Sequence, residues 1–201
     1  LIYEEQGLCN AARLWWILKN YGFEKIKLFD GGLREWKEKG GLLSLESDSS
    51  AAANFQLVEN PEMEFYISKA ELIQALKGNV HIVDTRTADE FSGKRQKKGA
   101  FQAGRIPGSI FIDWAEAVNY GSDKKIRTIS ELEKIYAASG LEKEDSIILY
   151  CHSGVRSAHT TFVLTQMLHY KKVKNYDGSW IEWSYFDNLP IEKDSLTQLL
   201  N

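Results

Sequence analysis

The 201-residue sequence predicts an α/β fold in which helices flank a central, mostly parallel β-sheet. From residue 65 to residue 183, apolar runs of strand length alternate with segments of helical periodicity, which is the pattern of a parallel sheet. Residues 147–150 form a continuous apolar run, which is typical of a strand at the centre of such a sheet. An internal repeat indicates that strands and helices follow one another in the same order near both ends of the chain.

The first 36 residues predict a strand, a helix, a second strand and a second helix. Residues 1–3 are a short apolar strand, and residues 10–21 carry apolar side chains at helical spacing. Gly22 follows where a C-cap glycine would end that helix. Residues 26–29 predict the second strand, and a glycine turn leads from it into the short second helix.

Residues 41–64 lack periodicity and contain runs of serine and alanine, which predicts a linker between two domains. We therefore expect the C-terminal part of a first domain, the linker, a complete second domain and a tail. Their expected bounds are 1–40, 41–64, 65–192 and 193–201. Because Leu1 opens what looks like the middle of a strand, we also expect that upstream sequence completes the first domain.

The second domain predicts five strands that alternate with helices. The strands are expected at 65–67, 80–84, 110–112, 146–150 and 173–176. The helices are expected at 72–76, 87–91, 128–138 and 157–169, and after 178. Ser68 with Glu71, and Thr128 with Glu131, have the spacing of capping boxes at two helix starts.

An offset of 147 residues aligns residues 3–36 with residues 150–183 without a gap. The clearest matches pair Asp30-Gly31 and Glu35-Trp36 with Asp177-Gly178 and Glu182-Trp183. Turn glycines and a helix tryptophan in one register indicate two copies of one domain, the first of them partial. In this alignment Glu4 falls at the place of Cys151 and Cys9 at the place of Arg156, so Cys9 is expected to be structural.

The composition argues against several classes of partner. The chain is 43% hydrophobic and 26% charged, which suits a globular protein with a sizeable core. A formal net charge of -3 gives no electrostatic reason to expect nucleic acid or an anionic membrane as the partner. Apolar runs also stay well short of the roughly 18 residues that a membrane span needs.

The chain has two cysteines, whose separation predicts neither a disulfide framework nor a metal cluster. A cysteine that stays a free thiol favours a reducing compartment. We therefore expect a cytoplasmic protein that holds no metal and no cofactor.

Cys151 is the strongest candidate for chemistry, because it follows the apolar strand and opens a loop that runs into a helix. The loop consists of Cys151, His152, Ser153, Gly154, Val155 and Arg156. Free N–H groups at a helix N-terminus stabilise a thiolate, which is the nucleophilic form of cysteine. The alternative is a buried cysteine without chemistry that happens to precede a helix.

The other loop residues suit an anion site. Gly154 lets the loop curl so that successive N–H groups point inward as an anion-binding nest. Arg156 can bind either a carboxylate of the scaffold or an oxyanion substrate. His152 and Ser153 are expected to point outward, where they could contact the substrate.

Four motifs in order along the chain resemble those of tandem-domain rhodaneses, the thiosulfate and 3-mercaptopyruvate sulfurtransferases. They lie at 83–86, 104–109, 151–164 and 175–183. The resemblance covers residues 1–40 and 65–192. It implies a rhodanese-like domain that carries the cysteine, preceded by a partial and inactive copy.

The resemblance implies that sulfur moves by double displacement. The Cys151 thiolate attacks the outer sulfur of a small anionic donor, thiosulfate or 3-mercaptopyruvate, and becomes a persulfide. A thiol or cyanide then accepts the sulfur. A second reading stays open, in which the chain is a rhodanese-like binding or regulatory module that does not turn over small donors.

Loop length distinguishes sulfur transfer from phosphate chemistry. Cysteine phosphatases use Cys-x5-Arg, which makes room for a tetrahedral phosphate. Here Cys151 and Arg156 have the shorter spacing Cys-x4-Arg, which suits one sulfur atom. We therefore do not expect phosphatase or arsenate reductase activity.

A second set of candidates lies outside the loop and comprises Asp84, Arg86, Lys98, Arg105 and Trp180. Asp84 and Arg86 are expected to form an ion pair that supports the loop rather than to act as catalysts. Trp180 is expected in the core or the pocket wall. Arg105 stands where the family usually has histidine, which puts the role of that histidine in doubt.

Charged residues near this set bear on the choice of donor. A basic run could attract an anionic donor or be a solvated loop, and it consists of Lys94, Arg95, Lys97 and Lys98. Glu90 stands where animal enzymes of the family carry a substrate-binding arginine. That departure argues against straightforward binding of mercaptopyruvate.

Overall fold

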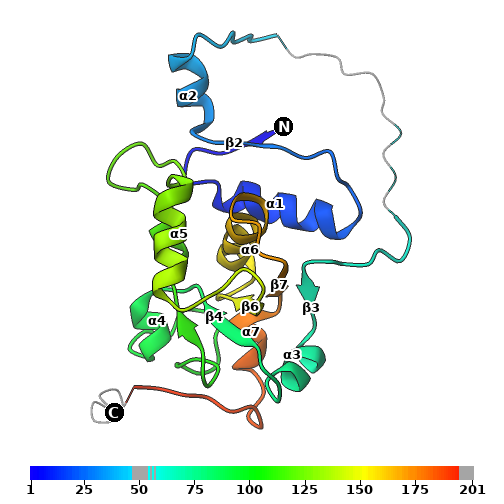
Figure 1. The fold of residues 1–201 in the computed structure, drawn as a ribbon, viewed down its shortest axis with the longest axis vertical. Helices are drawn as coiled ribbons and strands as arrows, with labels where there is room; N and C mark the ends of the chain where they lie inside the picture. The colour runs from blue at the N-terminus through cyan, green and yellow to red at the C-terminus, as the bar shows by residue number, and fades with distance from the viewer. Residues whose placement is uncertain (47–53, 55, 57, 195–201) are drawn as a thin grey trace.

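The computed structural model describes residues 1–46, 54, 56 and 58–194 (Figure 1). The middle of the predicted linker and most of the predicted tail lie outside the described residues. These undescribed positions are 47–53, 55, 57 and 195–201.

In the described part of the chain, the central element is a five-stranded parallel sheet with the order β3-β7-β6-β4-β5. Its strands are β3 (Tyr66–Ile67), β4 (His81–Asp84), β5 (Ile110–Phe111), β6 (Ser146–Tyr150) and β7 (Lys172–Tyr176). The apolar run of β6 is buried throughout and lies in the middle of the sheet, as its composition predicts. The prediction of an α/β fold with a parallel sheet is confirmed.

Helices connect these strands and cover both faces of the sheet. They are α3 (Lys69–Ala75), α4 (Ala88–Ser92), α5 (Ile129–Ala138), α6 (Val155–Phe162) and α7 (Ser179–Trp183), with a 3₁₀ turn η1 (Trp114–Ala117). The two predicted capping boxes, of Ser68 with Glu71 and of Thr128 with Glu131, are both formed. A third box at the start of α4 was not predicted.

Successive residues of β6 point to opposite faces and enter two separate cores. Ile147 and Leu149 pack in one core with side chains of α5 and of the segment that follows α6. Ile148 and Tyr150 pack in the other core, against residues of α3 and α7. Both cores reach the end of β6, so the residue that follows this strand starts from a rigid position.

The helix predicted over residues 157–169 differs from the observed one at both ends. It begins two residues earlier, at Val155, because Gly154 caps it with a φ of 78°. Beyond Phe162 it widens into a π-helical turn, η2 (Val163–Met167), which local periodicity does not reveal.

The N-terminal residues form a smaller unit: β1 (Ile2–Tyr3), α1 (Cys9–Asn20), β2 (Leu28–Phe29) and α2 (Gly32–Glu38). β1 and β2 pair in parallel, and α1 lies alongside α6 in Figure 1. Trp15 and Trp16 of α1 are buried together with Ala158 of α6 and with Phe65. The ring of Trp15 also meets the edge of Phe162 at a centroid distance of 5.2 Å. The N-terminal unit is therefore packed on α6 and on the segment around Phe65.

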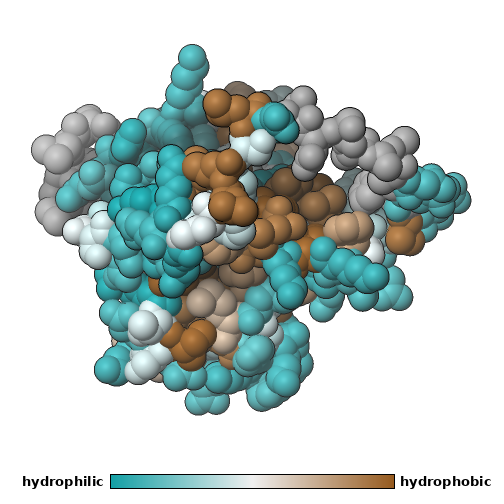
Figure 2. Space-filling view, turned by 90° about the horizontal axis from the view of Figure 1, so that it is seen from above, coloured by the Kyte–Doolittle hydropathy of each residue, from teal (hydrophilic) through white to brown (hydrophobic). Residues whose placement is uncertain are grey.

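The side of this unit away from α6 is less covered. A pocket there is lined by residues of β1, β2 and α2, including Phe29, Leu33 and Trp36. Large apolar side chains that remain exposed nearby include Leu1, Tyr3 and Trp36. Figure 2 shows hydrophobic residues gathered on the molecular face seen from this side.

Replacing Trp15 should reveal how much the contact of α1 with α6 contributes to stability. Trp15→Ala removes a buried ring and leaves a cavity, so we expect the free energy of unfolding to fall by about 3–5 kcal/mol. The half-exposed neighbour Leu14 provides the matched control, and Leu14→Ala should cost well under half as much. Urea denaturation measures both, and equal losses would contradict the packing of α1 described above.

Candidate active site

Cys151 lies at the carboxyl end of β6, and the loop that follows it closes tightly. Gly154 needs its positive φ of 78° to start α6. A side chain at this position would also collide with the carboxylate of Asp177. Both the conformation and the lack of space therefore require glycine here.

Ser179 holds the loop in its curled form. Its Oγ accepts hydrogen bonds from the N–H groups of Cys151 at 3.2 Å and Gly154 at 3.0 Å. The same hydroxyl donates to the carbonyl of Tyr176 at 2.9 Å. Ser179 is fully buried and takes an unusual φ of 51°, so α7 begins at a conformation that aims this hydroxyl at the loop.

Two further side chains fix the carbonyl of Gly154. Asn175 Nδ2 donates to it at 3.2 Å, and Arg13 Nη1 of α1 lies at 3.5 Å. Arg13 also forms an ion pair with Asp177, beside the loop. The N-terminal unit therefore contacts the loop directly.

The Cys151 thiol is buried, with 1% of the residue exposed, but its surroundings favour the thiolate. Burial raises the pKa of a thiol, yet the Arg156 charge, the Ser157 hydroxyl and the N–H groups of Ser157 and Ser153 outweigh it. The net pKa of Cys151 therefore lies below its ordinary value. A lowered pKa increases the fraction of thiolate, which is the nucleophilic form of cysteine.

Ser157 is a site residue that the sequence did not reveal. It is fully buried, and its hydroxyl forms no hydrogen bond with the described residues. Its position two residues inside α6 places both its N–H and its hydroxyl next to Cys151. A helical pattern alone cannot show that a serine faces back toward the start of its helix.

Arg156 is held by Glu90 of α4 through two hydrogen bonds, of 2.7 Å and 2.9 Å. Burial raises the pKa of the Glu90 carboxyl, but its bonds to Arg156 and Thr87 lower it to about 2. The sequence left open whether Arg156 binds a carboxylate of the scaffold or an oxyanion substrate. In the structure it binds the scaffold carboxylate of Glu90. The Thr87-x-x-Glu90 spacing was a readable signal for a helix start with Glu90 at its third position, but it does not reveal that Glu90 is buried.

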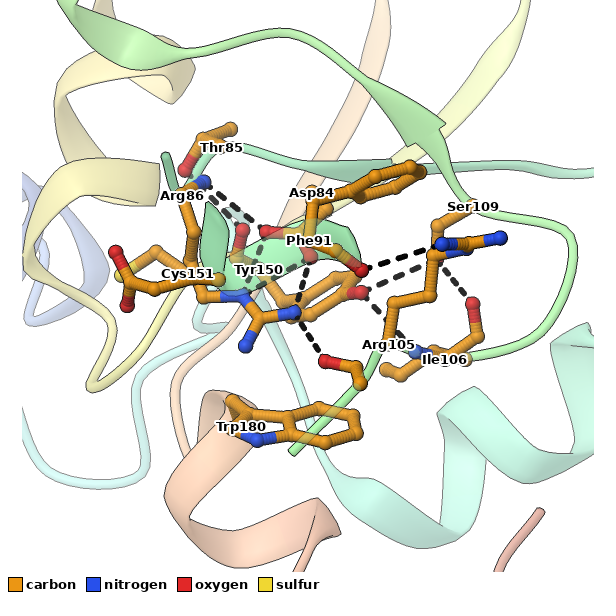
Figure 3. Close-up of polar contacts among 12 residues, drawn as sticks. Asp84, Thr85, Arg86, Phe91, Arg105, Ile106, Ser109, Tyr150, Cys151 and Trp180 are labelled. Carbon is orange, nitrogen blue, oxygen red and sulfur yellow. Dashed lines mark hydrogen bonds and ion pairs between the residues drawn. The ribbon is translucent and has the colours of Figure 1, made fainter. Parts of the chain in front are cut away.

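Asp84 and Arg86 form a buried ion pair, as expected. Arg86 binds both oxygens of Asp84 and donates to the carbonyl of Gly104 at 2.7 Å. Its guanidinium carbon lies 4.7 Å from the ring centre of Trp180 (Figure 3). The two buried charges therefore neutralise one another.

Trp180 and His152 form the wall of the site. The backbone N–H of Trp180 donates to the carbonyl of Cys151 at 3.0 Å, and its indole donates to the carbonyl of Gln102 at 2.8 Å. His152 Nε2 lies 3.1 Å from the carbonyl of Lys98. His152 is buried, so the expectation that it points outward is wrong: its ring is covered by the 98–99 segment.

The remaining candidates differ in position. Ser153 is exposed, as expected, and Val155 is partly covered at the first turn of α6. Lys98 approaches the loop through its carbonyl, and its side chain is exposed. Arg105 binds Glu192 and Asp194 and stacks on Phe91, so it ties the C-terminal segment to α4 and is not brought to Cys151.

The start of α1 mirrors this arrangement with a carboxylate. Glu4 accepts hydrogen bonds from the N–H groups of Asn10 at 2.6 Å and Ala11 at 2.9 Å. At the offset of 147 residues, Asn10 corresponds to Ser157, whose N–H stabilises the Cys151 thiolate. Burial and the nearby Glu4 raise the pKa of Cys9 to about 12, so Cys9 stays a thiol.

Within the described ranges, no group of three or more His, Cys, Asp or Glu residues is arranged to hold a metal. No helix of that part of the chain is long and apolar enough to cross a membrane.

Comparison with known proteins identifies relatives of this chain. The model of the rhodanese-like domain family matches residues 68–185. A Mycolicibacterium smegmatis protein named "Putative thiosulfate sulfurtransferase" is 38% identical over 201 residues, 97% of this chain and 71% of that protein. The Thermus thermophilus "Sulfur carrier protein TtuD" is 33% identical over 96% of this chain and 70% of that protein.

Solved structures give the same picture at lower identity. The anaerobic ergothioneine biosynthesis enzyme of Chlorobium limicola, bound to trimethyl histidine, superposes with a TM-score of 0.80 at 26% identity. An EanB variant described as a cysteine persulfide in a tetrahedral intermediate state with ergothioneine also gives 0.80 at 26%. Each match covers 92% of this chain, which spans 45% of the matched chain, less than half its length.

Removing the Ser157 hydroxyl should make the thiolate form of Cys151 less stable relative to the thiol. Ser157→Ala removes a buried hydroxyl that lowers the pKa of Cys151, so we expect that pKa to rise and the thiolate fraction below it to fall about tenfold. Thiolate absorbance in the ultraviolet, followed against pH in a Cys9→Ser background, measures this. Thr165→Ala, which deletes a hydroxyl beyond the end of α6, should leave the titration unchanged. An unaltered titration in Ser157→Ala would refute the contact.

The Glu90–Arg156 pair should make stability depend on pH in a defined window. The folded pKa of Glu90, about 2, lies below its ordinary 4.5, so its contribution is complete above 4.5 and is lost as pH falls toward 2. We expect Glu90→Gln to lower the free energy of unfolding by about 3 kcal/mol at pH 7 and by progressively less below pH 4.5.

Glu131 offers a matched control for Glu90. It also occupies the third position of a capping box and pairs with an arginine, Arg127, but on the surface. Glu131→Gln should therefore cost much less than Glu90→Gln. Urea denaturation between pH 7 and pH 3 compares the two variants, and equal losses would show that the buried pair adds nothing.

Proposed function

Because the chain belongs to the family of rhodanese-like domains, we propose that it is a sulfurtransferase that moves sulfur from thiosulfate to a thiol or cyanide. The printed names of its relatives include thiosulfate sulfurtransferases and a sulfur carrier protein, which supports sulfur transfer as the class of reaction. The identity of donor and acceptor rests on the site itself.

The observation that carries the proposal is the environment of Cys151, a buried thiol with a lowered pKa inside a loop of inward N–H groups. The thiolate attacks the outer sulfur of thiosulfate, the S–S bond of the donor breaks, and sulfite leaves with the bonding electron pair. The N–H groups of Ser153 and Ser157 then stabilise the negative charge of the Cys151 persulfide.

The second half-reaction restores the enzyme. A thiolate or cyanide attacks the outer sulfur of the persulfide, and Cys151 leaves as the thiolate that its surroundings favour. A lowered pKa therefore helps twice, because the same group is the nucleophile in one step and the leaving group in the other. One EanB structure with a cysteine persulfide shows such an intermediate in a protein of similar fold.

The Glu90–Arg156 pair favours thiosulfate over mercaptopyruvate as the donor. Both guanidinium nitrogens that face Glu90 are already occupied by its two oxygens. A carboxylate substrate would have to displace a buried, charge-matched partner, which costs free energy. Thiosulfate needs only its outer sulfur in the loop, and the short Cys-x4-Arg spacing suits that single atom.

We propose that residues 1–40 are a partial copy of the same unit. The parallel pair of Ile2 with Leu28 corresponds, at an offset of 147, to the pair of Leu149 with Asn175. Gly7 has a φ of 79°, against 78° at Gly154. In this proposal the Glu4 carboxylate replaces the thiolate, so the first copy performs no sulfur transfer.

Incubation with thiosulfate tests the proposed function. We expect the intact protein to gain the mass of one sulfur atom, located by peptide mass spectrometry on Cys151, and to lose it again to cyanide as thiocyanate. Cys151→Ser should gain nothing, whereas Cys9→Ser should gain as much as the unaltered protein. Absence of added sulfur on Cys151 across thiosulfate and mercaptopyruvate would reject the proposal and favour a binding module.

A further inference from the structure

The loop of residues 94–98 lies next to the site and is basic, and its charged side chains form no ion pairs with the described residues. α4 ends at Ser92 with Gly93 as its C-cap, and the next five residues include four basic ones. All four are exposed and form no ion pair with the described residues: Lys94, Arg95, Lys97 and Lys98. Because the whole chain has a net charge of -3, this concentration of positive charge is a local feature.

The basic loop is fastened to the active-site loop. Its last carbonyl, of Lys98, meets His152 Nε2 at 3.1 Å, one residue from Cys151. Three residues later, the N–H of Phe101 donates to Ser184 Oγ at 3.1 Å, and the carbonyl of Gln102 accepts from the Trp180 indole. The backbone of the basic loop therefore lies next to the loop that carries Cys151.

Nearby acidic groups do not cancel these charges. Glu90 is bound to Arg156, and Glu192 and Asp194 are bound to Arg105. Asp89 is exposed at the start of α4, where its carbonyl accepts from the N–H of Arg95. The basic loop itself therefore carries four exposed positive charges and no carboxylate.

Exposed aromatic rings continue the same surface. Phe101 is 59% exposed and Tyr185 is 57% exposed, and their rings meet edge to face at 4.7 Å. Exposed aromatic side chains beside basic groups are typical of protein interfaces. An exposed ring pair offers a macromolecular partner an apolar contact area.

We propose that the basic loop 94–98 and the Phe101–Tyr185 pair dock an acidic protein that presents a cysteine thiol to the Cys151 persulfide. This inference rests on the proposed function, since it names the acceptor of the second half-reaction. Because Cys151 is only 1% exposed, the acceptor must reach it on an extended segment, and the basic loop would hold acidic residues beside that segment. The acceptor thiolate attacks the outer sulfur, the S–S bond breaks, and the Cys151 thiolate is released while the acceptor becomes the persulfide.

Synthetic acceptor peptides test the docking. Three peptides would each carry one cysteine, flanked by glutamates, serines or lysines, and 2-mercaptoethanol would serve as an uncharged acceptor. The protein is first loaded with sulfur from thiosulfate and freed of donor, so that only the second half-reaction is followed. The readout is the ratio of the second-order rate constants for the acidic and the serine peptide.

Charge reversal shows whether the loop causes the preference. We expect a ratio of about tenfold in the unaltered protein, falling to about one or below in Lys94→Glu/Lys97→Glu. The matched control Lys25→Glu/Lys134→Glu reverses two exposed lysines elsewhere and should retain the ratio. Comparing variants cancels the intrinsic reactivity of each peptide thiol, and roughly 0.5 M salt should abolish the preference.

The outcomes separate the two proposals. Transfer to 2-mercaptoethanol without any preference for the acidic peptide, or a preference that survives reversal of the loop charges, would overturn the docking and leave sulfur transfer intact. Failure to load sulfur on Cys151 at all would instead reject the proposed function. A preference lost equally in the control variant would also overturn the docking, because it would reflect overall charge.

Discussion

The closure of the loop between β6 and α6 is the constraint on which the rest of the site depends. Three atoms decide it: the Oγ of Ser179, which takes two loop N–H groups, and the two hydrogens of Gly154, where no side chain fits. In the closed loop, some N–H groups donate to Ser179 and others stabilise the sulfur of Cys151. Buried N–H groups need hydrogen-bond partners. Because Ser179 accepts two of them, only the remaining N–H groups of the loop depend on the sulfur as their acceptor.

Two buried arginines lie near Cys151, and each is matched by one carboxylate. Arg86 with Asp84 is internal to the scaffold, so its field at the sulfur is small. Arg156 with Glu90 is different, because Arg156 is one of the groups that lower the pKa of Cys151 and Glu90 moderates its charge. The site therefore stabilises a thiolate although Arg156 is already paired with Glu90. Because of this pairing, the desolvated charges stay balanced whether or not a donor is present.

Local patterns in the sequence predicted the elements well, and contacts between distant segments explain what they missed. The strand 146–150, both capping boxes and the position of Cys151 follow from periodicity and spacing. His152 contacts the carbonyl of Lys98, 54 residues away in the sequence. Arg105 binds the carboxylates of Glu192 and Asp194, 87 and 89 residues away. Ser157 and Ser179 were hidden for another reason, since a serine at a helix start has many possible partners and the sequence does not say which one is near.

The Glu4 carboxylate at the start of α1 limits which substitutions this position tolerates. If a thiolate were simply deleted from such a loop, the N–H groups of Asn10 and Ala11 would be left without an acceptor. The Glu4 carboxylate supplies a negative charge at this spot and accepts both N–H groups. In the partial copy proposed above, a substitution of Glu4 that keeps an anion there would preserve the loop, whereas one that removes the anion would leave these N–H groups unpaired.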